Sequence, residues 1–112
     1  MNNPDWVEEF PGMISVCDTD AVILAMNQKE AKYFENRGGK KLIGTSLFEC
    51  HNEKSVQIIK KLLETQKTRI YTVEENGKKE IIIQAPWYQN GKLAGLVEIV
   101  CDIQDEIKHI VR

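Results

Sequence analysis

The sequence has few cysteines, no excess of basic residues and no long apolar stretch, and each shortage narrows the roles open to the chain. Its three cysteines, Cys17, Cys50 and Cys101, form no Cys-x-x-Cys pair, which argues against a disulfide framework and a structural zinc site. Fifteen Lys and Arg against 17 Asp and Glu give a net charge of −2, so no basic field attracts nucleic acid or anionic lipid. We expect reduced thiols, and neither nucleic acid nor a membrane as a partner.

Segments that would send the chain to a membrane are also missing from the sequence. No apolar run approaches the ~20 residues that span a bilayer. Met1 to Asp5 lacks the cationic and apolar regions of a signal peptide. The prediction is a cytoplasmic protein. Its 112 residues, 42% hydrophobic and 29% charged, fit one globular domain with a single core and room for a small internal cavity.

The beginning of the chain is predicted to form a short helix and a hairpin. Residues 5–10 carry an apolar stripe between two prolines, which predicts a short helix. The runs 13–17 and 21–26 are rich in β-forming side chains, and Asp18-Thr19-Asp20 between them suits a tight turn. We therefore expect an N-terminal helix followed by two antiparallel strands.

Two more helices are predicted before the last strands. Asn27 is followed three residues later by Glu30, the spacing of a capping box, which predicts a short helix that ends before Gly38-Gly39. Apolar residues at helical spacing over 53–66 predict the longest helix of the chain. The segment between these two helices is expected to contain loops or helical turns.

The last third of the chain has the pattern of an antiparallel meander. The β-rich runs 69–75, 79–88 and 93–101 are joined by Asn76-Gly77 and Asn90-Gly91, the residue pair best able to adopt positive φ at both turn positions. With the first hairpin, these runs predict an α+β fold: a five-stranded antiparallel sheet with helices on one face.

Large aliphatic side chains point to both faces of the predicted meander. Ile81-Ile82-Ile83, Leu96-Val97 and Ile99-Val100 are apolar on successive positions, so the face away from the helices must also be covered. Residues 102–111 predict a final helix with an isoleucine stripe. We expect an N-terminal helix or a dimer partner over this face, through Trp6, Phe10, Ile103, Ile107 and Ile110. The alternative is a monomer whose own N-terminal helix folds back.

Motifs of common enzyme classes are absent. The sequence contains no G-x-G-x-x-G, H-E-x-x-H or G-x-S-x-G, so we do not expect an enzyme. The one local cluster is Cys50-His51 at the entry of the long helix, where a helix N-terminus supports anions and lowers a thiol pKa. The alternative assignment is a buried, small Cys50 and a His51 bonded to backbone, because adjacent side chains at a helix start usually diverge.

Several segments in order resemble the PAS domain family. They are Asn27 after the second strand, Ile43-Gly44 before the long helix, and Gly91-x-x-x-Gly95 leading to Asp102-Ile103. The likeness covers residues 11–103. Cys50-His51-x-x-Lys54-Ser55 is similar to a prokaryotic subgroup in which Cys-His-x-x-Lys-Ser opens the same helix.

The resemblance implies a sensory or interaction module with a small pocket between the sheet and the central helices. It divides the chain into an N-terminal cap helix (1–10), the sensory domain (11–103) and the start of a connector helix (104–112). The pocket is expected to be lined by Phe34, Phe48, Cys50, His51, Ile59, Leu63 and Tyr71.

The resemblance leaves the bound group open between haem and a small organic ligand. The flavin-reactive Asn-Cys-Arg-Phe-Leu-Gln motif is missing, so flavin photochemistry is not expected. Haem-binding relatives carry their histidine on the long helix, whereas His51, the alternative haem ligand, precedes it. No other metal site is expected.

Three functional hypotheses follow. The leading one is a sensor in which a bound small molecule changes the packing of the long helix and so shifts the terminal helix and the dimer. The second is a ligand-free association scaffold whose pocket is filled by Phe34, Phe48, Leu63 and Tyr71. The third is a small enzyme that uses Cys50 and His51. A signalling partner could be another copy, a kinase or a transcription regulator.

Overall fold

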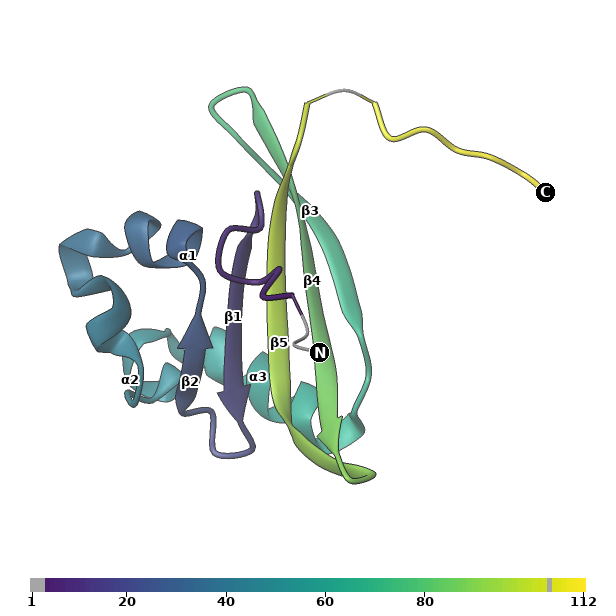
Figure 1. Ribbon diagram of the computed structural model, residues 1–112. Coiled ribbons are helices and arrows are strands. Elements are labelled where there is room, and N and C mark those ends of the chain that lie inside the picture. The colour runs from purple at the N-terminus through teal and green to yellow at the C-terminus, as the bar shows by residue number, and fades with distance from the viewer. Residues whose placement is uncertain (1–3, 105) are drawn as a thin grey trace.

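A five-stranded antiparallel sheet is the centre of the computed structural model, which describes residues 4–104 and 106–112 (Figure 1). The strand order is β2-β1-β5-β4-β3, so the two chain-terminal halves meet where β1 pairs with β5. The strands are β1 (Met13–Asp18), β2 (Ile23–Met26), β3 (Arg69–Glu75), β4 (Lys78–Gln89) and β5 (Lys92–Ile103). The predicted hairpin and meander are confirmed.

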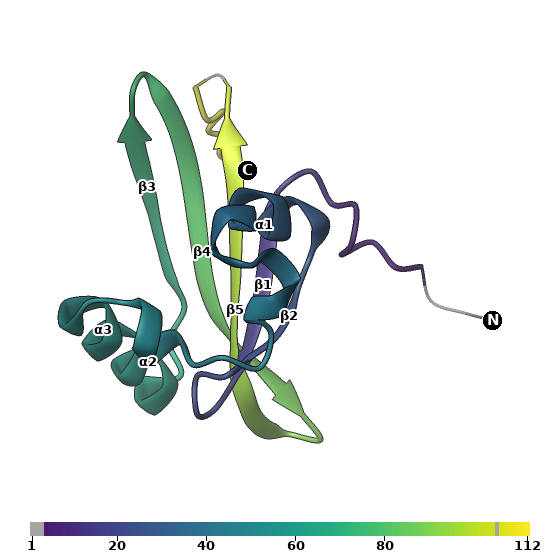
Figure 2. The ribbon, with the colours of Figure 1, turned by 90° about the vertical axis from the view of Figure 1, so that its left-hand side faces the viewer.

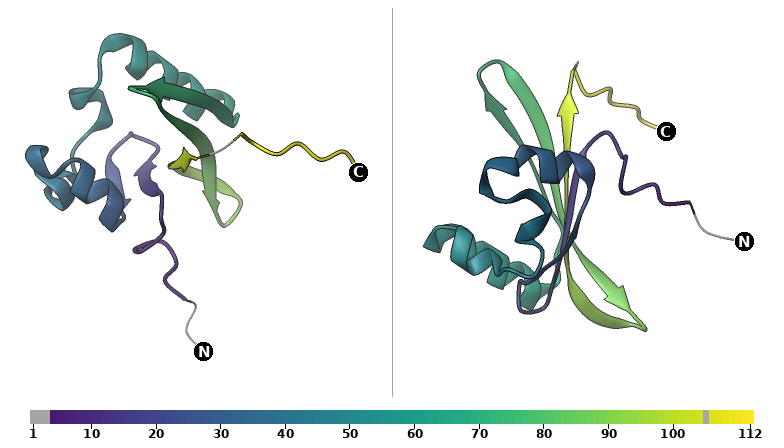
Figure 3. Two further views of the ribbon diagram at one scale, coloured as in Figure 1. Left: turned by 90° about the horizontal axis from the view of Figure 1, so that it is seen from above. Right: turned by 60° about the vertical axis from the view of Figure 1, so that its left-hand side comes forward.

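The helices lie on one side of this sheet, as the views in Figures 2 and 3 show. They are α1 (Gln28–Tyr33), the 3-10 turns η1 (Glu35–Arg37) and η2 (Gly39–Leu42), α2 (Leu47–Cys50) and α3 (Glu53–Thr65). Both terminal segments emerge on the opposite side, which we call the outer face. The predicted α+β fold is therefore confirmed.

Residues with positive φ make the turns of the sheet. Asn76 and Gly77 join β3 to β4, and Asn90 and Gly91 join β4 to β5, with φ between 53° and 79°. In the first hairpin, Asp18 Oδ1 accepts hydrogen bonds from the backbone N–H groups of residues 20 and 22 at 2.9 and 3.0 Å. Short polar side chains therefore fix the strand register in the way the sequence predicts.

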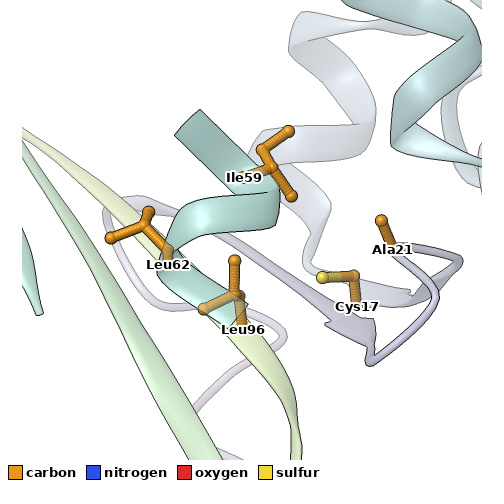
Figure 4. Close-up of a cluster of buried hydrophobic side chains, with 5 residues drawn as sticks. All are labelled: Cys17, Ala21, Ile59, Leu62 and Leu96. Carbon is orange, nitrogen blue, oxygen red and sulfur yellow. The ribbon is translucent and has the colours of Figure 1, made fainter. Parts of the chain in front are cut away.

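The hydrophobic core joins α3 to the centre of the sheet. Ile59 and Leu62 of α3 face Cys17 and Ala21 of the first hairpin and Leu96 of β5 (Figure 4). All five are buried. These contacts fix α3 against the first hairpin and β5.

Asn27 connects β1, the N-terminal segment and α1. Its side chain is 1% exposed and makes three hydrogen bonds. Nδ2 donates to Gly12 O at 2.8 Å, while Oδ1 accepts from the N–H groups of Ile14 at 3.0 Å and Glu30 at 3.1 Å. A single buried amide thus caps α1 and fixes the position of that helix against β1.

The predicted N-terminal helix is wrong. Within the described residues 4–10 the chain forms only a turn over 6–9, with Phe10 N donating to Val7 O at 3.3 Å. Six residues between two prolines offer too few hydrogen bonds to offset helix nucleation. The segment is instead held by Glu8, whose carbonyl accepts from Gln28 N at 3.1 Å and whose carboxylate pairs with Lys40 at 2.9 Å. Residues 1–3 lie outside the described part.

The predicted C-terminal helix is also wrong. β5 continues to Ile103, which pairs with Lys79 of β4, and residues 106–112 have no regular secondary structure. Ile107 and Ile110 are exposed, so the isoleucine stripe is not packed against the rest of the chain. A helix of about ten residues without packing is marginal in water. Asp105, also within the predicted helix, lies outside the described residues.

The outer face of the sheet is apolar at its centre, as the sequence indicates. The strand register places Ile81, Ile83, Val97 and Ile99 on this face, and all four are half-buried. Ile70, on the edge strand β3, is 60% exposed. Apolar side chains therefore remain accessible on the face opposite the helices.

Replacing Asn27 tests its role as the link between α1 and the sheet. Asn27→Ala leaves the buried N–H of Ile14 and carbonyl of Gly12 without their side-chain partner, so the free energy of unfolding should fall by about 3 kcal/mol. Urea denaturation measures the change. Asn36→Ala, at an exposed position, is the matched control and should stay within about 0.5 kcal/mol of the wild type. Equal stability of both variants would contradict the assigned role.

Candidate functional site

A cavity of about 400 Å³ lies between the helices and the inner face of the sheet. Its size is within the range of small-molecule sites. The apolar wall comes mostly from the helices and β2, and the polar groups come mostly from the strands. The apolar side chains are Ile23, Met26, Phe34, Leu42, Leu47, Ile58, Ile59, Leu62 and Leu96, and the main polar ones are Ser15, Glu30, Arg37, Ser55, Arg69, Tyr71, Gln84 and Glu98.

Glu30 is the most deeply buried charged group of the cavity wall. It is 6% exposed, and its Oε2 has no hydrogen-bond partner among the described residues. Its backbone N–H donates to Asn27 Oδ1, so the N-terminus of α1 holds it over β1. Below it, Ser15 of β1 stands directly opposite Glu98 of β5. A buried carboxylate oxygen without a donor is costly, so this wall carries an unused hydrogen-bond acceptor.

A chain of polar contacts crosses three neighbouring strands on the inner face. Arg69 of β3 donates to Gln84 Oε1 at 3.2 Å, and Gln84 Nε2 donates to Glu98 Oε2 at 2.7 Å. The guanidinium of Arg69 also lies 4.1 Å from the ring centroid of Tyr71. Because the arginine fixes the orientation of the Gln84 amide, Glu98 receives a donor at a defined position.

The environment of Glu30 changes its acidity. Burial, followed by repulsion from Glu98, raises the pKa of the Glu30 carboxyl to about 7, although a hydrogen bond with the Ser15 side chain lowers it in part. The carboxyl is therefore divided between its neutral and charged forms near neutral pH. Strongly shifted groups in a cavity are typical of functional sites.

Cys50 and His51 are in contact, contrary to the expectation that their side chains diverge. Cys50 Sγ lies 3.2 Å from His51 Nδ1, and Cys50 is exposed, so its assignment as a buried residue is wrong. His51 Nδ1 is also 2.8 Å from Leu47 O, which confirms its predicted bond to backbone. Because a carbonyl can only accept, Nδ1 carries the proton and is not a base toward the Cys50 thiol. Haem iron could reach this imidazole only through Nε2.

The structure brings five of the seven predicted pocket residues to the cavity wall, and two lie elsewhere. Phe48 and Leu63 pack instead against the buried core cluster. The five at the wall are Phe34, Cys50, His51, Ile59 and Tyr71. Within the described residues, no group of three or more His, Cys, Asp or Glu side chains is placed to hold a metal ion.

Sequence reasoning missed the polar side of the cavity. Ser15, Gln84 and Glu98 stand at alternate positions of otherwise apolar strands, where they share the inner face. Polar residues that interrupt a buried strand were the available signal. Glu30 was identified only as a capping residue, yet its carboxyl faces the cavity because Ile14 O already accepts the Asn27 N–H that a capping box would use.

The raised pKa of Glu30 predicts a stability that depends on pH. Between its ordinary pKa of 4.5 and its folded value of about 7, the folded chain binds more protons than the unfolded chain. The stability therefore falls as pH rises through this window, by roughly 3 kcal/mol at most. Glu30→Gln is neutral at every pH, so its advantage over the wild type should grow from pH 5 to pH 8 in urea denaturation.

Glu64→Gln is the control for this measurement. Glu64 is exposed on α3 and does not line the cavity, so this variant should follow the pH dependence of the wild type. A constant difference between Glu30→Gln and the wild type over the whole range would show that Glu30 titrates normally.

The fold is similar to several solved sensory domains. The PAS domain of the histidine kinase ThkA matches with a TM-score of 0.67 and 14% identity over 81% of this chain and 99% of that one. A sensory box sensor histidine kinase from Vibrio cholerae gives 0.63 and 17% over 87% and 86%. VqmA bound to DPO, also from Vibrio cholerae, gives 0.69 and 19% over 88% and 54%.

Comparison with family models supports the same relationship, whereas no curated protein sequence matches this chain. Among the described residues, no helix is long and apolar enough to cross a membrane. The family model of the PAS fold matches residues 7–108, which is most of the sequence. The chain belongs to the PAS fold family.

Proposed function

We propose that the chain is a sensory module that binds a small molecule in the cavity between α1, α3 and the sheet and passes the binding event to its terminal segments. The observation that carries this proposal is the cavity itself: about 400 Å³ of space beside a buried carboxylate oxygen that lacks a partner among the described residues. A site used only for packing would be filled by side chains. VqmA, a structural relative, binds DPO, which supports a ligand in this fold.

Two continuous elements connect the cavity to the ends of the chain. β5 carries Glu98 at the cavity and continues without interruption to Ile103, where the C-terminal segment begins. On the other side, Asn27 and Glu30 link the cavity to Gly12 and so to the N-terminal segment. A ligand that moves α1 or β5 therefore acts on both termini, provided it binds the two arrangements with different affinity.

The proposal includes a homodimer that buries the outer face. Half-buried Ile81, Ile83 and Ile99 and exposed Ile70 form an apolar surface there. Trp6 and the C-terminal Ile107 and Ile110, all exposed, lie in the segments on the same side. Phe10 and Ile103, both half-buried, complete the predicted contact set.

A second candidate function, a ligand-free association scaffold, is favoured by the same outer face. That face does not depend on the contents of the cavity, and a protein partner such as a kinase could cover it as well as a second copy. The cytoplasm suits either function, because all three cysteines are free thiols. Neither function needs a catalytic residue.

Filling the cavity tests the sensory function. Ser55→Leu adds bulk at the cavity wall from the first turn of α3, while Gln57→Leu adds the same side chain on the exposed side of that helix. We expect fragment-sized molecules to shift the amide resonances of residues 47–62 and 104–112 in wild type and Gln57→Leu, but not in Ser55→Leu. Nuclear magnetic resonance titration of a fragment library measures this.

Two results would contradict the sensory proposal. The first is a library that shifts no amide of residues 47–62 in the wild type. The second is binding to Ser55→Leu with unchanged affinity, which would place the ligand outside the cavity. In the first case native mass spectrometry of the freshly purified protein should also find no bound molecule.

Charging the outer face tests the dimer. Ile99→Arg places a cation at the centre of the outer face, where its desolvation would cost several kcal/mol in an interface, so the dimer should dissociate to a monomer. Gln57→Arg, at an exposed position of α3 on the helical side of the sheet, is the control and should leave the mass unchanged. Light scattering coupled to size-exclusion chromatography reports the mass. A wild type that is monomeric at high concentration would disprove the dimer.

A further inference from the structure

We propose that the cavity selects a small organic cation, a compact molecule with an apolar body and one ammonium or amidinium group that binds to the carboxylates of Glu30 and Glu98. This inference rests on the sensory function proposed above and assigns the chemical class of its ligand.

The acceptor that such a cation needs is already present at the cavity wall. Glu30 lines the cavity and is only 6% exposed. Its Oε2 has no donor among the described residues. Ser15, which interacts with the same carboxyl, pairs across the strands with Glu98. Two carboxylates from different elements therefore face one space, and a bound N–H group can donate to the oxygen that lacks a partner.

Two of the three basic side chains at the cavity wall, Arg69 and His51, are engaged with other groups, and the third, Arg37, is exposed. Arg69 donates to Gln84 and stacks on the Tyr71 ring. The Gln84 amide lies between the guanidinium of Arg69 and the carboxylate of Glu98. Arg37 of η1 lines the cavity but is exposed. The imidazole of His51 donates from Nδ1 to Leu47 O. None of these groups forms an ion pair with Glu30 in the described structure.

The opposite wall fits an apolar body rather than a second charge. Met26, Phe34, Ile58, Ile59 and Leu62 all line the cavity. An anion would be repelled by Glu98 and by ionised Glu30, and the low dielectric would strengthen this repulsion. A neutral donor could satisfy one oxygen but would leave the repulsion between the two carboxylates. A cation attached to an apolar body satisfies both walls.

Cation binding has a signature in protons. With the pKa of Glu30 at about 7, half of the molecules carry a protonated Glu30 at pH 7. A bound cation favours the ionised form, so the protein releases up to about half a proton per ligand at that pH. An apolar ligand without charge would deepen the desolvation of Glu30 and cause proton uptake instead.

The experiment compares three probes with one carbon skeleton: benzylamine, benzyl alcohol and benzoate. Isothermal titration calorimetry at pH 7 in two buffers of different ionisation enthalpy gives the affinity and the number of protons released. Amide shifts of residues 47–62 confirm that the probe occupies the cavity. Glu30→Gln is the test variant, and Glu64→Gln, exposed on α3, is the matched control.

We expect benzylamine to bind at least about tenfold more tightly than either other probe, with proton release. Glu30→Gln should weaken benzylamine about tenfold or more and abolish proton release, while Glu64→Gln should change neither. Tighter binding of benzyl alcohol or benzoate, or unchanged benzylamine binding by Glu30→Gln, would overturn the assigned class and leave the sensory function standing. If no probe shifts the cavity amides, the cation assignment fails, and the fragment library decides separately on the sensory function.

Discussion

The buried amide of Asn27 is the constraint on which the arrangement of the other elements depends. It is the point where the N-terminal segment, β1 and α1 meet, and its three hydrogen bonds satisfy backbone groups from all three. Without it, α1 has six residues and too few intrahelical bonds to persist alone. Because α1 forms one wall of the cavity, a structural hydrogen bond also determines the position of a functional group, Glu30.

Glu30 lowers the stability of the fold at the same position where the proposed ligand would bind. A carboxyl with an unpartnered oxygen in a wall of apolar side chains destabilises the fold whenever it is ionised. The same oxygen is available to a ligand because no side chain of the described protein uses it. The buried cluster of Cys17, Ile59 and Leu62 and the hydrogen bonds of Asn27 offset this cost.

The sequence predicts most of the sheet because its signals are local. Asn-Gly pairs define two turns by backbone conformation alone, and Asp18 defines a third through its own side chain. Apolar stripes predict both terminal helices, but a stripe stabilises a helix only where it is packed against a surface, and Trp6, Ile107 and Ile110 are exposed here. The cavity is harder to predict. The direction of the Glu30 side chain depends on the hydrogen bond that the Asn27 N–H donates to Ile14 O. That is a tertiary contact, which spacing along the sequence does not contain.

The alternation of side chains along β5 couples the two surfaces of the domain. Glu98 faces the cavity, while its neighbours Val97 and Ile99 face the outer side of the same strand. A strand cannot move one of these side chains without moving the adjacent ones, because they share two peptide units. Ligand binding at Glu98 and association through Ile99 therefore act on one rigid element. If both occur, they are linked, and by reciprocity the dimer must change ligand affinity by the factor with which the ligand changes dimer affinity.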